Sequence, residues 1–107
     1  MALLSIAFVG RDRMTALNRR WKGRRVPTDV LAFPLAGPDG SLAGDIYICP
    51  WLAARHARDL GIPLRQELTR LVIHGVLHVL GYDHPETAGR AASPMWRRQE
   101  RYLRGLR

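Results

Sequence analysis

The feature that most constrains this chain is one apolar segment that also holds three of its four histidines. The histidines fall in the run His74-Gly75-Val76-Leu77-His78-Val79-Leu80-Gly81-Tyr82-Asp83-His84. From Pro63 onward the segment is apolar nearly all round, through Leu68, Leu71, Val72, Val76, Leu77, Val79 and Leu80. A helix that is apolar on every side is typical of a buried element. We therefore predict a central buried helix against which the rest of the chain packs.

The histidine spacing predicts a metal site on this helix. Residues four apart on an α-helix lie on the same face, so His74 and His78 can hold one ion between them. Gly81 tolerates the left-handed conformation that ends many helices, and the turn can return His84 as a third ligand. Three neutral imidazoles leave the fourth position of a tetrahedral zinc open, as in catalytic sites. The alternative is that the histidines are hydrogen-bonded core residues, but a third histidine beyond the glycine favours a metal.

The other segments predict a small mixed sheet packed on the helix, an α/β (α+β) fold. The expected strands are Leu3–Val9, Asp29–Leu35 closed by Pro34, and Leu42–Cys49, the last two forming a hairpin around Pro38-Asp39-Gly40. The other expected helices are one capped by Asp12 and running to Trp21, one from Pro50 through Leu60 ended by Gly61, and one opened by Ser93-Pro94. In the last helix we expect Met95, Tyr102, Leu103 and Leu106 to face inward, and Arg97, Arg98, Arg101 and Arg104 to face outward.

Length and cysteine content narrow the class of protein. With 107 residues we expect a single domain spanning residues 1–107. One cysteine, Cys49, allows no intramolecular disulfide and is expected to be a small buried hydrophobe in a reducing compartment. Met1–Val9 does not read as a signal peptide, and no apolar run approaches the ~20 residues of a membrane span. We expect a cytoplasmic protein with no membrane partner.

The charge balance points to a polyanionic partner. The net charge is +8, and 16 of the 17 basic residues are arginine. A basic surface attracts nucleic acid. The arginine side chain binds phosphate in a bidentate manner and stacks on unpaired bases, which suits single-stranded RNA. The same composition could also be a solvated surface without a partner. Charge alone leaves both interpretations open.

The spacing of the three histidines, with Gly81 between the second and third, is also that of zinc metalloproteases of the H-E-x-x-H-x-x-G-x-x-H type. Those enzymes carry a glutamate after the first histidine as the catalytic base, and this chain has Gly75 there. Peptide hydrolysis is therefore disfavoured. Phosphodiester cleavage depends more on charge stabilisation at the phosphoryl oxygens, which a metal and a nearby cation can supply.

Three segments together resemble the YbeY endoribonucleases, bacterial rRNA maturation factors. The histidine run is similar to the family motif H-G-x-L-H-L-x-G-Y-D-H. Leu17-Asn18, Trp21-Lys22-Gly23 and Pro27–Pro34 are similar to L-N-x-x-Y-R-G and P-T-D-V-L-S-F-P, and Gly44–Ile48 to G-D-I-x-I. Met95 and Gln99-Glu100 resemble the family's last helix. The similarity covers nearly the whole chain in the same order.

The resemblance implies a single-strand-specific, zinc-dependent endoribonuclease in maturation of the 3′ end of 16S rRNA and in ribosome quality control. It implies rRNA and the small ribosomal subunit as partners. One zinc per chain would be held by His74, His78 and His84. Lys22 takes the place of the family's functional arginine as the catalytic cation, with Arg24 and Arg25 as RNA-binding candidates. Asp83 would orient a ligand histidine from the second shell of the metal site or cap the turn.

Family members usually carry a further strand and helix before the segment that matches Leu3–Val9. Because this chain begins there, we expect an exposed sheet edge or apolar patch that favours pairing with another molecule. Two other functions remain open beside the endoribonuclease: a non-catalytic, zinc-stabilised ribosome-assembly factor, and a metalloprotease-like hydrolase.

Overall fold

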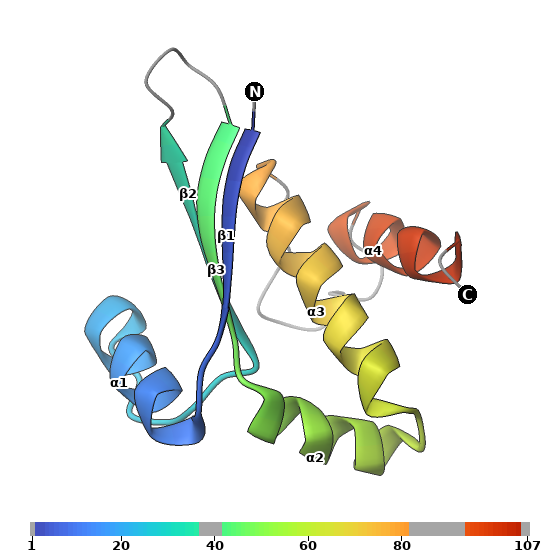
Figure 1. The fold of residues 1–107 in the computed structure, drawn as a ribbon, viewed down its shortest axis with the longest axis horizontal. Helices are drawn as coiled ribbons and strands as arrows, with labels where there is room; N and C mark the ends of the chain where they lie inside the picture. Colours follow the sequence, from blue (N-terminus) through green and yellow to red (C-terminus); the bar gives the residue numbers. More distant parts are fainter. Residues whose placement is uncertain (1, 37–41, 82–93, 106–107) are drawn as a thin grey trace.

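The structure is a computed structural model that describes residues 2–36, 42–81 and 94–105. In these residues three strands and four helices follow one another in a mixed α/β arrangement, as predicted (Figure 1). The elements are β1 (Ala2–Phe8), α1 (Arg11–Lys22), β2 (Val30–Ala36), β3 (Leu42–Ile48), α2 (Pro50–Leu60), α3 (Leu64–Val79) and α4 (Pro94–Gly105).

The three strands form one sheet in the order β1-β3-β2. β1 runs parallel to β3 and β2 runs antiparallel to it, so the predicted pairing of the second and third strands is confirmed. The expected turn at 38–40 lies outside the described residues. Pro34 does not close its strand, because β2 continues to Ala36 with Pro34 opposite Gly44. β2 is an edge strand, where a residue without an N–H is tolerated.

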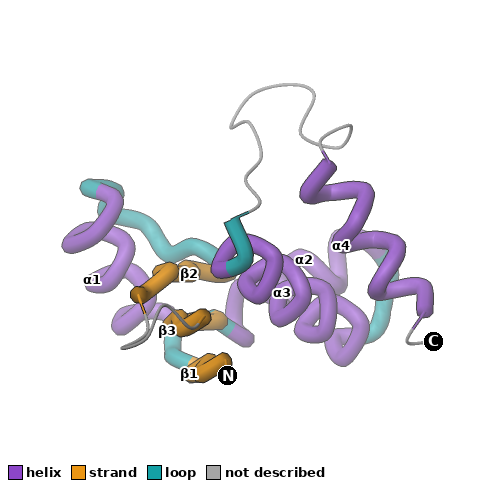
Figure 2. The backbone as a smooth tube through the Cα atoms, turned by 90° about the horizontal axis from the view of Figure 1, so that it is seen from above, coloured by secondary structure: helices purple, strands orange, loops and turns teal. Residues whose placement is uncertain are grey.

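Helices cover both faces of the sheet, with α1 on one side and α3 on the other (Figure 2). Alternation along the strands builds a separate apolar cluster on each face. The cluster on the α1 side contains Val9, Met14, Leu31 and Cys49, and the cluster on the α3 side contains Ile46, Ile48, Ala53, Leu71 and Val79. The predicted burial of Cys49 is confirmed, since its side chain is fully buried.

Two glycines bring α3 close to the sheet. A Cβ built on Gly75 would lie 2.6 Å from Ile46 Cγ2, and one built on Gly44 would lie 2.6 Å from Val79 Cγ2. Real Cβ atoms do not approach other carbons so closely. The position after His74 therefore faces β3 and the core, and the hydrogen atom of glycine is what lets α3 lie this deep.

The helix ends follow the sequence signals with one exception. Pro50 begins α2, and Gly61 ends it in the left-handed conformation with φ 67°. The prediction that Asp12 caps α1 is wrong, because the helix begins at Arg11 with Gly10 as N-cap and no side-chain cap. Asp12 lies in the first turn, where its negative charge is still favourable beside the helix dipole.

α4 packs along α3 through a narrow buried strip. Leu103 is buried as predicted, and so is Gln99. The prediction that Tyr102 faces inward is wrong, because its side chain is 46% exposed and its hydroxyl accepts a hydrogen bond from Arg98. The exposure of Arg97, Arg101 and Arg104 is as predicted, and Arg98 is half-buried. The expected orientations of Met95 and Leu106 fall on side chains outside the described residues.

β1 forms the other edge of the sheet, as expected. Its residues Leu4, Ile6 and Phe8 are exposed, although the last two lie opposite the core residues Ile46 and Ile48. An apolar strip therefore continues the sheet beyond the area that α3 covers.

Among the described residues, the helices are all too short or too polar to cross a membrane.

Candidate functional site

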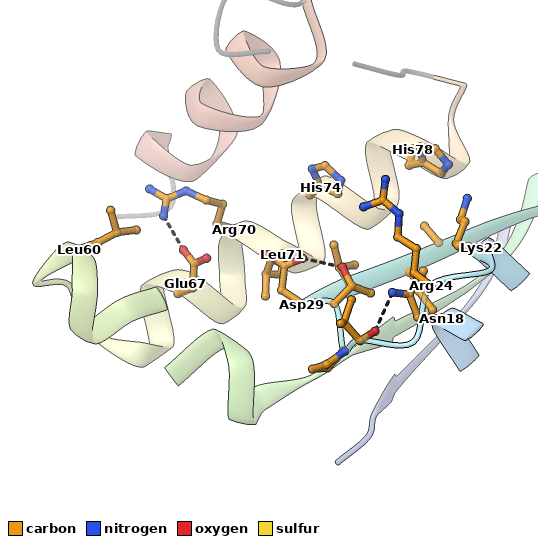
Figure 3. Close-up of a pocket in the computed structure, with 16 residues that line it drawn as sticks. Asn18, Lys22, Arg24, Asp29, Leu60, Glu67, Arg70, Leu71, His74 and His78 are labelled. Atoms are coloured by element: carbon orange, nitrogen blue, oxygen red, sulfur yellow. Dashed lines mark hydrogen bonds and ion pairs between the residues drawn. The ribbon is translucent and has the colours of Figure 1, made fainter. Parts of the chain in front are cut away.

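A polar pocket of about 700 Å³ lies between the end of α1 with the loop that follows it and the side of α3 that carries the histidines (Figure 3). Its lining residues are Asn18, Lys22, Arg24, Val26, Pro27, Thr28 and Asp29, then Val30, Leu31 and Ala32 of β2, Leu60 of α2, and Glu67, Arg70, Leu71, His74 and His78 of α3. Histidines of the predicted site thus face a cationic loop across one cavity.

The histidine side of the pocket is a polar stripe along α3. Residues 67, 70, 74 and 78 recur at the spacing of one helix face and all line the pocket. His74 and His78 stand one turn apart, and both are half-buried. Gly75 and Leu71, on the adjoining side of the helix, pack against the sheet, so packing determines which way the imidazoles point.

The cationic side of the pocket is positioned by the end of α1. Gly23 adopts the left-handed conformation with φ 73°, and its N–H donates to Arg19 O at 3.0 Å. Buried Asn18 donates its Nδ2–H to Val26 O at 2.8 Å, which fastens the loop back onto the helix. Lys22, the last residue of α1, and Arg24, in the loop that follows, therefore reach the pocket from a segment that hydrogen bonds hold in place.

Two other residues of this segment lie elsewhere. Arg25 is exposed and does not line the pocket. Trp21 is 56% exposed, with its ring tilted against Phe33 at a centroid distance of 5.5 Å. The indole therefore lies at the surface beside the pocket loop and not in the core.

Two adjacent residues of α4, Gln99 and Glu100, contact the polar stripe of α3. Glu100 accepts hydrogen bonds from Arg70 Nε at 2.9 and 3.2 Å, and Arg70 also donates to Glu67 at 2.6 Å. Gln99 lies beside this ion-pair network, with its Oε1 2.8 Å from His74 Nδ1. α4 thus contacts two pocket residues of α3 directly.

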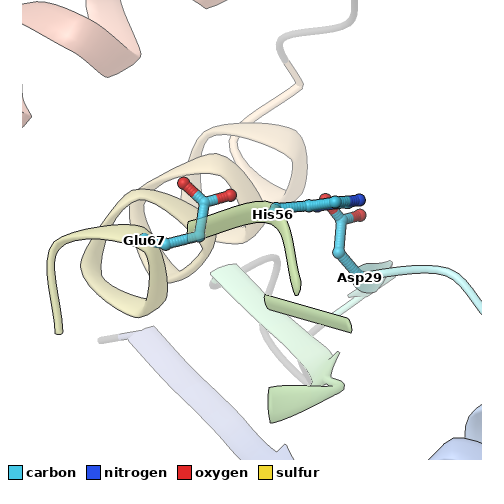
Figure 4. A group of neighbouring side chains, drawn as sticks. All are labelled: Asp29, His56 and Glu67. Carbon is cyan, nitrogen blue, oxygen red and sulfur yellow. The ribbon is translucent and has the colours of Figure 1, made fainter. Parts of the chain in front are cut away.

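A second group of potential ligands lies at the other end of the pocket (Figure 4). Ligand atoms of Asp29, His56 and Glu67 all lie within 4.8 Å of one another. His56 Nδ1 is 3.6 Å from Asp29 Oδ2, and Glu67 is nearly buried but already paired with Arg70. His56 is therefore not a simple surface residue. Within the described part of the chain, this is the group of three side chains whose geometry suits a cation.

The structure brings together His74, His78, Lys22 and Arg24 of the residues singled out in the sequence. His84 and Asp83 lie outside the described residues, so the three-histidine set stays a prediction. Sequence reasoning missed the contact of Gln99 with His74 and that of Arg70 with Glu100. Neither has a local signal, since the partners are 25 and 30 residues apart in the chain.

The described residues fit a metal ion at the histidine pair. Two imidazoles one turn apart on a packed helix are ligands that zinc prefers, and both face the cavity. The neighbouring Lys22 and Arg24 bring no further ligand atoms for a cation, but they suit an anionic group that would share the cavity with it. The two imidazoles thus offer two nitrogen ligands, and the two cations offer N–H donors to an anionic group.

Fold and pocket define a class of small mixed α/β proteins in which an imidazole-bearing helix faces a cationic loop. A family model described as Endoribonuclease YbeY matches residues 1–107. The chain therefore belongs to the endoribonuclease YbeY family, as the sequence motifs indicated.

Individual relatives agree with this assignment. The chain is 38% identical over 100 residues to "Endoribonuclease YbeY" of Thermotoga sp. (strain RQ2), covering 94% of this chain and 65% of the relative. It is 49% identical over 89 residues to "Endoribonuclease YbeY" of Anaeromyxobacter sp. (strain Fw109-5), covering 81% of this chain and 46% of the relative. The chain thus spans less than two thirds of the length of these curated relatives.

The fold is also similar to a solved structure, the solution structure of TM1509 from Thermotoga maritima. The TM-score is 0.66 at 35% sequence identity, covering 96% of this chain and 67% of that one. The mixed α/β arrangement that positions the pocket is therefore shared with an experimentally determined relative.

Proposed function

We propose that this protein is a metal-dependent endoribonuclease that cleaves single-stranded RNA. The observation that carries the proposal is the pocket itself, where His74 and His78 face Lys22 and Arg24. Membership of the endoribonuclease YbeY family supports the same activity. The proposed substrate is rRNA at the 3′ end of the 16S molecule, on the small ribosomal subunit, and hence in the cytoplasm.

The proposed metal is one zinc ion per chain, held by His74, His78 and His84. When bound there, zinc supplies Lewis acidity at a phosphoryl oxygen. The Asp29, His56 and Glu67 group is the weaker candidate because an arginine already occupies one of its carboxylates. Asp83 follows the histidine helix closely and is proposed to orient one of the ligand imidazoles.

Lys22 and Arg24 are proposed to act on the RNA phosphate. The Lys22 ammonium is a compact charge that can neutralise a phosphoryl oxygen as negative charge develops there. The Arg24 guanidinium, two residues after Lys22, offers a planar set of N–H donors to a neighbouring phosphate. Arg25 is proposed to contact the RNA backbone outside the pocket, because it is exposed and away from the pocket lining.

A specific observation argues against a metalloprotease-like hydrolase. The residue after His74 points at Ile46, and even a Cβ there would lie 2.6 Å from Ile46 Cγ2. A glutamate at position 75 would have to displace Ile46, so the packing of α3 on β3, as well as the missing catalytic base, argues against that chemistry.

The test is single-turnover cleavage of an end-labelled single-stranded RNA by zinc-loaded wild type, His78→Ala and His56→Ala. Because a metal contributes several kcal/mol to such reactions, His78→Ala is expected to lower the rate about 100-fold or more. His56→Ala, which removes an imidazole outside the pocket lining, should cleave like wild type. If wild type binds the RNA but does not cleave it, the non-catalytic assembly factor is the correct interpretation.

A further inference from the structure

Gln99 of α4 is placed against a proposed metal ligand. Its Oε1 lies 2.8 Å from His74 Nδ1, and its side chain is only 2% exposed. An amide oxygen accepts hydrogen bonds and cannot donate them. With the amide oxygen of Gln99 placed toward the ring, His74 Nδ1 is the atom that carries the hydrogen and donates it.

This hydrogen bond selects one form of the imidazole. In a neutral histidine one ring nitrogen carries a hydrogen and the other a lone pair. With the hydrogen on Nδ1, the lone pair of His74 is on Nε2, and a metal ion can bind only through a lone pair. We propose that Gln99 is a positioning residue that holds His74 in the Nδ1–H tautomer, so that Nε2 is ready to bind the metal. This inference rests on the proposed metal site.

The rest of the α4 contact explains why Gln99 is held in place. The next residue, Glu100, accepts two hydrogen bonds from Arg70, which lies one helical turn before His74 on the same face of α3. Adjacent residues of α4 thus contact two α3 residues that are themselves neighbours on the helix surface. Leu103, one turn further along α4, is buried and adds apolar contact. Both the position and the rotation of α4 are constrained.

The arrangement couples the last helix to the site. Hydrogen-bond partners of metal-binding histidines fix the ring orientation, and removing them lowers metal affinity about 10–100-fold. Burial strengthens the effect here, because water reaches Gln99 poorly and does not replace the lost acceptor. The last helix is then part of the site and not only a cover for α3.

The experiment uses the full chain and two independent readouts. The first is the tautomer of His74 in metal-free protein, read from the ring nitrogen chemical shifts and couplings in NMR spectra. The second is the zinc dissociation constant, measured by competition with a chelator. The variants are Gln99→Met, which keeps size but lacks the amide oxygen, and Gln99→Glu, which keeps an acceptor. Arg101→Gln is the matched control, because it changes an exposed side chain of α4 and leaves Gln99 and Glu100 unchanged.

Wild type and Gln99→Glu should show the Nδ1–H tautomer, and Gln99→Met should shift His74 toward the Nε2–H form. Zinc affinity should fall about 10–100-fold in Gln99→Met and stay near wild type in the other two variants. An Nε2–H tautomer in wild type, or an equal loss of affinity in Arg101→Gln and Gln99→Met, would overturn the proposal. If the tautomers behave as expected but the protein does not cleave RNA, the proposed function fails and this inference stands.

Discussion

Replacing Gly75 by alanine tests how deeply the histidine helix is packed on the sheet. Two effects of this change oppose each other. Alanine favours a helix interior over glycine by about 0.8–1.0 kcal/mol. Against this, the new Cβ would lie 2.6 Å from Ile46 Cγ2 and 3.1 Å from its Cδ1, so the core has to shift.

Extra methyl or methylene groups in a well-packed core cost about 1–3 kcal/mol. The expected net result is a loss of about 1 kcal/mol in the free energy of unfolding. For a chain of this length, the melting temperature should then fall by about 4 °C. Whether Gly75→Ala lowers or raises the free energy of unfolding depends on how far Ile46 can move, because Ile46 supplies all three of the nearest atoms.

A double-mutant cycle with Ile46→Ala isolates that contact. Ile46→Ala alone should cost about 2–5 kcal/mol, because it leaves a cavity. In that background Gly75→Ala meets no clash, and it should stabilise the protein by roughly the helix propensity, about 1 kcal/mol. The measurement is urea unfolding of all four proteins, followed by circular dichroism. If Gly75→Ala stabilises both backgrounds equally, α3 does not press against β3, and the account of how the imidazoles are oriented is wrong.

Three further predictions concern the pocket and the helix that closes it. Lys22→Ala should lower single-turnover RNA cleavage by ~100-fold with little change in RNA affinity, whereas Lys22→Arg should keep or raise activity; wild-type cleavage by Lys22→Ala would place the catalytic cation elsewhere. Arg24→Ala should reduce the slope of log affinity against log salt by about 0.7, the share of one phosphate contact with single-stranded RNA, while Arg58→Ala on the exposed side of α2 should leave it unchanged. Glu100→Gln should lower the free energy of unfolding by about 1–2 kcal/mol, since it weakens a largely buried, charged pair of hydrogen bonds to Arg70; calorimetry that finds no change would mean that this contact does not anchor α4.

Local sequence signals predicted most of the elements. Pro50 and Gly61 mark the ends of α2 because ring geometry and a positive φ act within one or two residues. Alternation predicted the first strand, and β-branched and aromatic residues bounded by turn signals predicted the second. The signals failed where two local preferences compete. Asp12 is a good cap residue, but Gly10 allows the helix to begin earlier, and Pro34 is tolerated only because β2 is an edge strand.

The candidate site was predictable only in part, for a related reason. The helical period alone put His74 and His78 on one face. That Lys22 shares their pocket came from a family resemblance and not from spacing, because the loop and α3 meet only through the tertiary fold. The contact of Gln99 with His74 also depends on how α4 packs against α3, and neither residue alone predicts it from the sequence. The group of Asp29, His56 and Glu67 is likewise assembled from three separate segments.

Zinc content per chain tests the central claim most directly. Wild type, His78→Ala and His56→Ala should be purified identically and analysed by elemental mass spectrometry beside protein concentration. The account predicts one zinc per chain in wild type and in His56→Ala, and a large loss of zinc in His78→Ala. The opposite pattern, with zinc retained in His78→Ala and lost in His56→Ala, would place the metal at the Asp29, His56 and Glu67 group and contradict the account.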